Sequence, residues 1–448
     1  MTRPIGWLGI LRLGLVQAGL GSIVVLTTST LNRVMVVELA LPALIPGALV
    51  AFHYVLQVLR PRLGYGSDLG GRRTPWILGG MAALTLGGMG AAGGTALMTT
   101  NLAAGIGLAL VAFALVGVGV GSAGTALLTL LAKRVDPTRR AAAATIVWLM
   151  MIAGIAVTAT IAGKALDPFS PERLVIVTSV AAAVAFVVAV LAVWGMEGAA
   201  SEPVATPAGH SGGFLAALAE VWAEPQARRF AIFVFVSMLA YSAQELILEP
   251  FAGAVFALTP GQSTGLTGLH HAGVLGGMAL VAVCSVLAGG FRARAMRIYT
   301  VGGCIGSAVA ILLLAASGPL GLGWALREGV LLLGAANGAF AVSAIGSMMG
   351  LASNGRASRE GTRMGLWGAA QALAFGAGGL AGTAASDLAR HVFGSPATAY
   401  AAVFGMEAVL FLAAAALAVG VFQTDGDLQE TGETAQRPAV NRNAVQAG

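Results

Sequence analysis

Long apolar runs separated by short polar connections recur along the whole chain. A membrane-spanning helix needs about 20 predominantly apolar residues. Twelve runs reach or approach that length, and they predict helices at residues 13–37, 42–59, 75–99, 103–132, 141–165, 172–196, 229–257, 265–290, 298–317, 320–351, 365–388 and 397–422. We therefore expect an all-α membrane protein with twelve transmembrane helices.

The composition excludes a water-soluble globule. Of the 448 residues, 57% are hydrophobic and 10% are charged, whereas about 25% of the residues in an average soluble domain are charged. The 64 glycines lie mostly inside the apolar runs, which is typical of closely packed membrane helices. Cys284 and Cys304 both stand in apolar surroundings, so neither a disulfide framework nor a thiolate metal cluster is indicated.

The basic residues predict the orientation in the membrane. Fourteen of the 25 Lys and Arg lie in the loops after the second, fourth, eighth and tenth runs: Arg60, Arg62, Arg72, Arg73, Lys133, Arg134, Arg139, Arg140, Arg292, Arg294, Arg297, Arg356, Arg359 and Arg363. Because short cytoplasmic loops carry an excess of Lys and Arg, both termini and the central linker are expected in the cytoplasm. Orientation accounts for the net charge of +6 without a nucleic-acid partner.

The polar breaks divide the chain into two six-helix halves. We expect an N-terminal half at residues 1–196, a cytoplasmic linker at 197–228, a C-terminal half at 229–422 and a disordered cytoplasmic tail at 423–448. Residues 214–222 fit a short interfacial helix, and a plain linker fits them equally well. The sequences of the two halves are weakly similar at an offset near 219 residues, which makes His53 and His271 equivalent positions. Parallel duplicated halves are the architecture of major facilitator transporters.

The loop after the second run resembles the loop signature of the major facilitator superfamily. It contains Gly64, Asp68, Gly71, Arg72 and Arg73. Glycines permit a tight turn at the bilayer surface, and the carboxylate and arginines can bridge to neighbouring helix ends, so we expect this loop to stabilise one conformation of the bundle. An ordinary positively charged cytoplasmic loop is the alternative. Residues 291–297, the corresponding loop of the second half, lack the Asp and the glycines.

A few ionisable residues fall at membrane depth, where they are costly and suggest function. Arg33 and Glu38 lie near the outer end of the first run, and Glu245 and Glu249 lie in the equivalent part of the seventh. An ion pair of Arg33 with Glu245 or Glu249 could gate the seam between the halves, or a carboxylate there could couple transport to protons. Structural pairing and exposure at the outer interface are the alternatives. Glu407 is expected to face the bundle interior.

Three histidines lie inside predicted spans. His53, with Gln57 one turn later, belongs to the second run, and His270 and His271 belong to the eighth. Such residues either bind a ligand or act as hydrogen-bond donors in helix packing. The sequence contains none of the motifs for ATP hydrolysis, proteolysis or acyl transfer, so it names no catalytic residue and gives no support for an enzyme.

Two segments resemble the PucC/LhaA family of phototrophic bacteria: residues 26–42, which include the stretch T-L-N-R-V-M-V-V-E-L at 30–39, and residues 60–77. The resemblance implies a major facilitator relative in the bacterial inner membrane that assembles light-harvesting complexes and handles bacteriochlorophyll. It also implies antenna or reaction-centre polypeptides as partners. Bacteriochlorophyll contains a Mg2+ ion that accepts an axial ligand, and His53 or His271 could supply this ligand. Gln57 could orient the imidazole. No other metal site is expected.

Two functions from different classes therefore stay open. The first is an assembly factor that binds bacteriochlorophyll and passes it to light-harvesting or reaction-centre polypeptides. The second is a proton-coupled transporter of a small hydrophobic solute, with Glu38, Glu245 or Glu249 as the coupling carboxylate. The low number of charges at membrane depth favours a large apolar cargo, because a sugar or ion symporter needs converging polar groups near the midplane.

Overall fold

The structure, a computed structural model, describes residues 5–57, 72–136, 139–197, 222–287, 293–354 and 360–436. The first run forms one continuous helix from Trp7 to Glu38, made of α1 (Trp7–Val25), η1 (Leu26–Thr30), α2 (Leu31–Arg33) and η2 (Val34–Glu38). The next five helices are α3 (Leu44–Leu56), α5 (Thr74–Leu97), α6 (Leu102–Arg134), α7 (Arg140–Leu166) and α8 (Pro171–Val193). The last six are α10 (Pro225–Phe256), α11 (Pro260–Leu287), α12 (Ala293–Ser317), α13 (Gly323–Asn354), α14 (Glu360–Phe393) and α15 (Pro396–Gln436).

These twelve helices of the described chain confirm the predicted all-α class. Ten of them are long and apolar enough to cross a membrane, and α3 is a shorter apolar helix. The first turns contain the residues that helix starts favour. Asn101 and Ser170 accept hydrogen bonds from the backbone N–H groups of Ala104 and Arg173, and α8, α10, α11 and α15 each begin at a proline.

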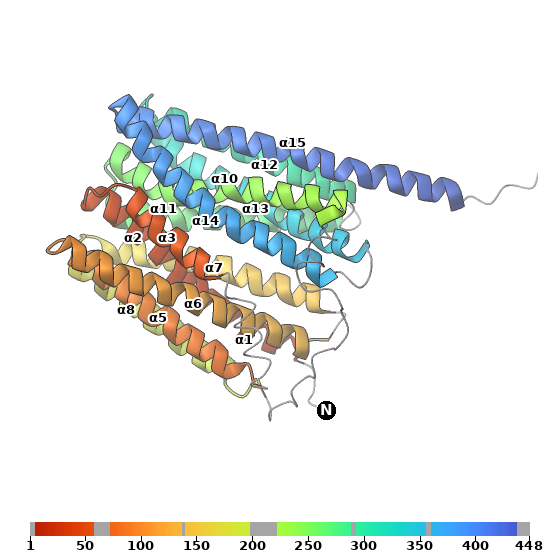
Figure 1. The fold of residues 1–448 in the computed structure, drawn as a ribbon, viewed down its shortest axis with the longest axis horizontal. Helices are drawn as coiled ribbons and strands as arrows, with labels where there is room; N and C mark the ends of the chain where they lie inside the picture. Colours follow the sequence, from red (N-terminus) through yellow and green to blue (C-terminus); the bar gives the residue numbers. More distant parts are fainter. Residues whose placement is uncertain are drawn as a thin grey trace, which may run out of the picture.

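The helices assemble in two groups (Figure 1). The first six, from α1 to α8, pack mainly on one another through α1 with α7 and α5 with α6, and the last six do so through α11 with α13 and α12 with α15. The most extensive contacts between the groups are α3 with α14 and α7 with α11, and the first span adds smaller contacts of η1, α2 and η2 with α10 and of η1 with α11. Residues 198–221 lie outside the described residues, so the linker and its interfacial helix stay predictions.

Two features of the helices differ from expectation. The first span is π-helical at Leu26–Thr30 and again at Val34–Glu38, and such wider turns occur frequently at functional sites. At the other end, α15 continues to Gln436, beyond residue 422 where the last span was expected to end, and the disordered tail stays a prediction. Extending an existing helix needs only one further hydrogen bond per residue, and the next proline is Pro438.

Candidate functional site

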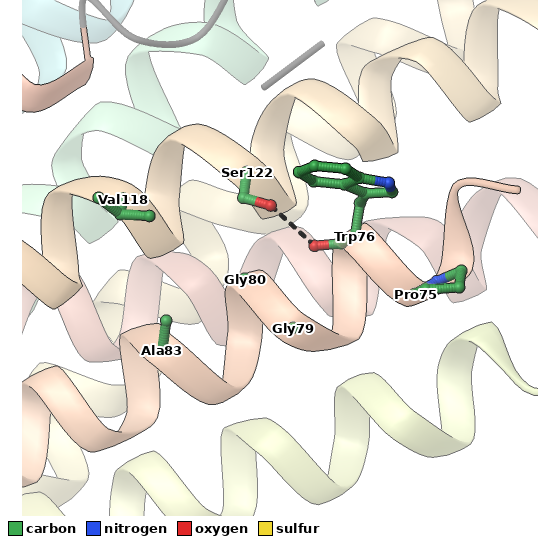
Figure 2. A pocket seen from close by; sticks show the side chains of 7 residues that line it. All are labelled: Pro75, Trp76, Gly79, Gly80, Ala83, Val118 and Ser122. Carbon is green, nitrogen blue, oxygen red and sulfur yellow. Dashed lines mark hydrogen bonds between the residues drawn. The ribbon is translucent and has the colours of Figure 1, made fainter. Parts of the chain in front are cut away.

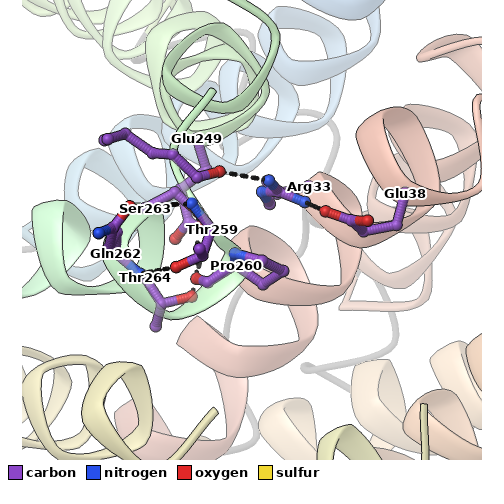
Figure 3. Close-up of polar contacts among 9 residues, drawn as sticks. Arg33, Glu38, Glu249, Thr259, Pro260, Gln262, Ser263 and Thr264 are labelled. Carbon is purple, nitrogen blue, oxygen red and sulfur yellow. Dashed lines mark hydrogen bonds and ion pairs between the residues drawn. The ribbon is translucent and has the colours of Figure 1, made fainter. Parts of the chain in front are cut away.

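Arg33 is the largest fully buried side chain of the described residues, with 2% of its surface exposed (Figure 3). Its Nη1 lies 2.5 Å from Glu38 Oε1, so the ion pair forms within the first span. Its Nη2 donates a hydrogen bond of 2.6 Å to the carbonyl of Leu258, just after α10. The guanidinium also attracts the Glu249 carboxylate, so of the two glutamates predicted as partners, Glu249 is the one that faces it.

Threonines of both helix groups complete the surroundings of Glu249. The Thr267 hydroxyl donates to Glu249 Oε1 over 2.5 Å, and the Thr264 hydroxyl approaches Oε2 at 3.3 Å. Thr264 in turn lies 3.1 Å from the hydroxyl of Thr30 in η1. The buried carboxylate is therefore compensated by a cation and two hydroxyl groups, which makes a charge tolerable at this depth.

Asn32 replaces a backbone hydrogen bond that is missing from α10. Pro250 lies inside α10 and has no N–H, so the Leu246 carbonyl, four residues earlier, loses its helical donor. The Asn32 Nδ2 donates to that carbonyl over 2.5 Å, and both Asn32 and Leu246 are buried. A side chain of the first span thus replaces a backbone hydrogen bond of the seventh.

Asp387 near the end of α14 holds the start of α3. Its two carboxylate oxygens accept hydrogen bonds from the backbone N–H groups of Ala43 at 2.9 Å and Leu44 at 2.8 Å. A carboxylate is favourable there because it satisfies unpaired N–H groups and complements the positive end of the helix dipole. Gly47, one turn further along α3, leaves no space for a Cβ against Thr383 of α14.

We call the contacts between the two helix groups at this end of the bundle the seam. It consists of Thr30, Asn32, Arg33, Ala43 and Leu44 on one side and Leu246, Glu249, Leu258, Thr264 and Asp387 on the other. The helices α7 and α11 also approach closely, since a Cβ at Gly163 would lie 2.7 Å from the Gly261 carbonyl oxygen. The two helix groups are therefore held together here by a few polar contacts and by close packing of α7 on α11 at glycines.

A row of aromatic rings crosses from one helix group to the other. His53 and Tyr54 of α3 have ring centroids 4.1 Å apart, and Tyr54 lies 5.4 Å from Phe375 of α14. The row continues from Phe375 to Tyr241 at 5.9 Å and from Tyr241 to His270 at 6.3 Å. His271 adjoins His270 at 5.1 Å. Tyr54, Tyr241 and Phe375 are partly exposed, whereas the three histidines are buried, so the structure places all three predicted histidines along one row.

The hydrogen bonds of the histidines fix which ring nitrogen bears the proton. The Nδ1 of His53 lies 2.6 Å from the Val50 carbonyl, and the Nδ1 of His271 lies 2.9 Å from the Thr267 carbonyl. Because a carbonyl only accepts, both neutral rings carry the proton on Nδ1 and the lone pair on Nε2. An imidazole in this tautomer can ligate a metal through Nε2 while Nδ1 donates to the carbonyl. Gln57 is buried at the end of α3, one turn after His53.

His270 has a different environment. Its Nε2 lies 3.4 Å from Gln244 Nε2 and 3.3 Å from Asn337 Nδ2, so two side-chain amides converge on it. The Ser307 hydroxyl donates to Asn337 Oδ1 over 2.8 Å and extends this buried network to α12. With the amide nitrogens facing it, His270 Nε2 accepts from α10 and α13, so this nitrogen is engaged by neighbouring helices.

Only part of the predicted conformational loop can be placed. Gly64, Asp68 and Gly71 lie outside the described residues. The backbone N–H of Arg73 donates to Glu197 Oε1 and Oε2 at 2.7 and 2.8 Å, and that of Thr74 donates to Oε2 at 2.7 Å. Glu197, four residues after the end of α8, therefore caps the start of α5, directly beside the loop. Arg72 is exposed and Arg73 is buried.

A shallow groove of about 290 Å3 lies between α5 and α6 (Figure 2). Its lining is formed by Pro75, Trp76, Gly79, Gly80, Ala83, Val118 and Ser122. The Ser122 hydroxyl donates to the Trp76 carbonyl over 3.0 Å, so its polar lining is already paired. It contains none of the predicted site residues.

Comparison with known proteins identifies the family. A family model described as "PUCC protein" matches residues 30–426. The chain belongs to the PucC family. It is 52% identical to the "Bacteriochlorophyll synthase 44.5 kDa chain" of Rhodobacter capsulatus, over 94% of this chain and 97% of that protein. It is 30% identical to "Protein PucC" of the same organism, over 93% of both chains. The family resemblance of residues 26–42 and 60–77 is therefore confirmed.

Solved structures place this PucC-family chain in the major facilitator fold. A bacterial homolog of the human lysosomal transporter Spinster, in an inward-facing conformation, matches with a TM-score of 0.67 over 93% of this chain and 96% of that one, at 15% identity. The peptide transporter POT in complex with sulfate matches with a TM-score of 0.68 over 95% and 97%, at 16% identity. These likenesses confirm the predicted fold of a multi-pass membrane protein.

The structure of this PucC-family protein adds residues that the sequence pattern did not select. Asp387 and the aromatic residues Tyr54, Tyr241 and Phe375 were not among the predicted site residues. A proline inside an apolar run, such as Pro250, together with an Asn at similar depth in another run, is a signal that could have indicated the Asn32 contact. The aromatic row had no such signal, since its members are far apart in the sequence.

Proposed function

We propose that this PucC-family protein is a membrane assembly factor that binds bacteriochlorophyll and delivers it to light-harvesting or reaction-centre polypeptides. The family membership and the name of its 52% identical relative support this role. The observation that carries the proposal is the row of aromatic rings between His53 and His271, which crosses both helix groups and ends in imidazoles at each side.

The residues of the row fit the pigment chemically. Bacteriochlorophyll, when bound, supplies a Mg2+ ion with a free axial position and a flat apolar macrocycle. His271 presents a neutral imidazole with its lone pair on Nε2, which can ligate Mg2+ without burying a charge, and His53 is a second neutral imidazole at the other end of the row. The partly exposed rings of Tyr54, Tyr241 and Phe375 offer apolar faces for stacking. No step of this role needs a catalytic residue, so we propose a non-enzymatic protein despite the word synthase in the relative's name.

The absorbance spectrum of the gently purified protein tests the proposal. We expect copurified bacteriochlorophyll together with antenna or reaction-centre polypeptides from the native membrane. His53→Phe and His271→Phe should each lower the pigment bound per protein or shift its long-wavelength band. His270→Phe is the matched control, because its Nε2 is engaged by Gln244 and Asn337, and it should retain the pigment if the protein folds. Wild-type pigment content in both His53→Phe and His271→Phe would refute histidine ligation, and a pigment-free wild type would refute the function.

The second candidate function is a proton-coupled transporter of a small hydrophobic solute. One observation favours it: Glu245 is a partly exposed carboxylate one turn from Tyr241 on α10, between the aromatic row and the seam. Uptake into pigment-free proteoliposomes, driven by a pH gradient and lost in Glu245→Gln, would support transport. The same assay with Glu38→Gln and Glu249→Gln would separate a coupling carboxylate from the paired carboxylates of the seam. We propose the inner membrane as the location, with both termini in the cytoplasm, from the distribution of Lys and Arg.

A further inference from the structure

Glu407 is a buried carboxyl group that the seam and the aromatic row do not use. It lies in α15 with 1% of its surface exposed, and neither side-chain oxygen has a hydrogen-bond partner in the described part of the protein. Val403, Phe404 and Phe411, which lie three or four residues from Glu407 on the same face of α15, are also buried. The helix packs against α10, α12 and α14, within the apolar core of the last six helices.

In the described part of the chain, no cation forms an ion pair with this carboxyl group. The titratable or charged side chains on the helices that pack against α15 are Arg228, Arg229, Tyr241, Glu245 and Glu249 of α10, Arg294, Arg297, Tyr299 and Cys304 of α12, and Asp387, Arg390 and His391 of α14; Glu360 and Arg363 belong to the first turn of α14. Among the described residues none of them forms an ion pair with Glu407. Glu249 already faces Arg33.

An ionised carboxylate in this place would be among the most costly groups in the bundle, because it is buried among apolar side chains and has no partner in the described part of the protein. The neutral acid is tolerated far better in an apolar environment. In the neutral form the O–H has no acceptor among the described residues, and an unpaired ionisable group at membrane depth suggests a function.

We propose that Glu407 is a proton-binding site of the C-terminal helices. The carboxyl group holds a proton while α15 is packed against α10 and α12, and it exchanges that proton with water only when this packing opens. Release leaves a carboxylate on Glu407 and transfers the proton to water, and binding is the reverse, so no further reactant is needed. The site is independent of pigment binding and would persist if the proposed function were wrong.

Infrared spectroscopy of the purified protein in lipid nanodiscs tests the protonation. A protonated carboxyl group gives a C=O stretching band that a carboxylate lacks. We expect the wild type to have such a band near neutral pH and Glu407→Gln to lose it. Glu38→Gln is the control, because Glu38 is ion-paired with Arg33 and should not contribute to the band. Identical spectra of the wild type and Glu407→Gln would overturn the proposal.

Exchange into D2O tests the link to packing. The band of Glu407 should shift slowly in the wild type and at least several-fold faster in Phe411→Ala, which removes a fully buried ring one turn along α15. Leu412→Ala removes a side chain that is 47% exposed on the same helix and should leave the exchange slow. If Glu407→Gln does not fold, Glu407→Asp replaces it, because the shorter side chain moves the carboxyl group by one methylene: a carboxylic band that shifts from its wild-type position supports the proposal, and an unchanged band refutes it. Equal exchange rates in all three proteins would refute the coupling to packing.

Discussion

The hydrogen bond from Asn32 to Leu246 makes a prediction that a double-mutant cycle can test. Asn32→Ala removes the donor and leaves the Leu246 carbonyl buried without a partner. An unsatisfied buried carbonyl costs about 1–3 kcal/mol, whereas cross-helix hydrogen bonds in a membrane protein average about 0.6 kcal/mol. We expect Asn32→Ala to lower the free energy of unfolding by about 1–2 kcal/mol, because the proline excludes any substitute donor within α10.

The second arm of the cycle is Pro250→Ala. An alanine at this position restores a backbone N–H, which can donate to the Leu246 carbonyl four residues earlier. In this background the carbonyl no longer depends on Asn32, so Asn32→Ala should cost less than about 0.5 kcal/mol. The cycle therefore predicts a coupling free energy of about 1 kcal/mol between two residues of different helix groups.

Unfolding of the four proteins by SDS titration in mixed micelles measures these free energies. Ser242→Ala is the matched control, since its hydroxyl also donates from a buried side chain to a backbone carbonyl, that of Phe375, over 2.6 Å. Ser242 lies eight residues before Pro250, about 12 Å along the helix, so its cost should be the same in both backgrounds. An equal cost of Asn32→Ala with and without Pro250 would refute the reasoning.

Two further predictions concern the ends of the bundle. Asp387→Asn keeps one acceptor but loses the charge at the start of α3, so we expect the free energy of unfolding to fall by about 1 kcal/mol. A cysteine introduced by Leu44→Cys should then be labelled faster by a thiol reagent. Unchanged labelling would contradict a role of Asp387 in the seam. Asp68→Asn should alter protease or thiol accessibility of the bundle while the pigment spectrum stays the same, because the loop is expected to stabilise a conformation without contacting pigment; a folded variant that loses its pigment would contradict this.

The sequence predicted the parts of the fold that depend on local composition. Twelve helices follow from the lengths of the apolar runs, and their starts at Asn101, Ser170 and several prolines follow from capping preferences. The π-helical turns around Leu31 could not be predicted in this way, because they depend on how the first span fits against α10 and α11. The helical continuation to Gln436 was missed because composition alone does not reveal whether an existing helix propagates.

The candidate site was predicted less completely, for a physical reason. Burial costs single out charged residues and histidines in apolar runs, so Arg33, Glu249 and His53 could be selected from the sequence. The sequence offered Glu249 as one of two partners of Arg33, but it could not choose between them or add Glu38, since the depth and rotation of each helix decide these contacts. Arg33 pairs with Glu38 of its own span, and the Nε2 atoms of adjacent His270 and His271 differ because the two rings point to different neighbours.

The seam and the aromatic row share the contact between α3 and α14, and this links closure to binding. Asp387 of α14 holds the start of α3, while Phe375 of α14 packs on Tyr54 of α3. A movement that separates these two helices must release the Asp387 hydrogen bonds and divide the row at the same time. A ligand that lies along the undivided row would therefore stabilise the closed seam, and by linkage the closed seam would strengthen binding by the same free energy. Under the proposed function, release of the pigment would then require opening of the contact between α3 and α14, so delivery would be a conformational event rather than simple dissociation.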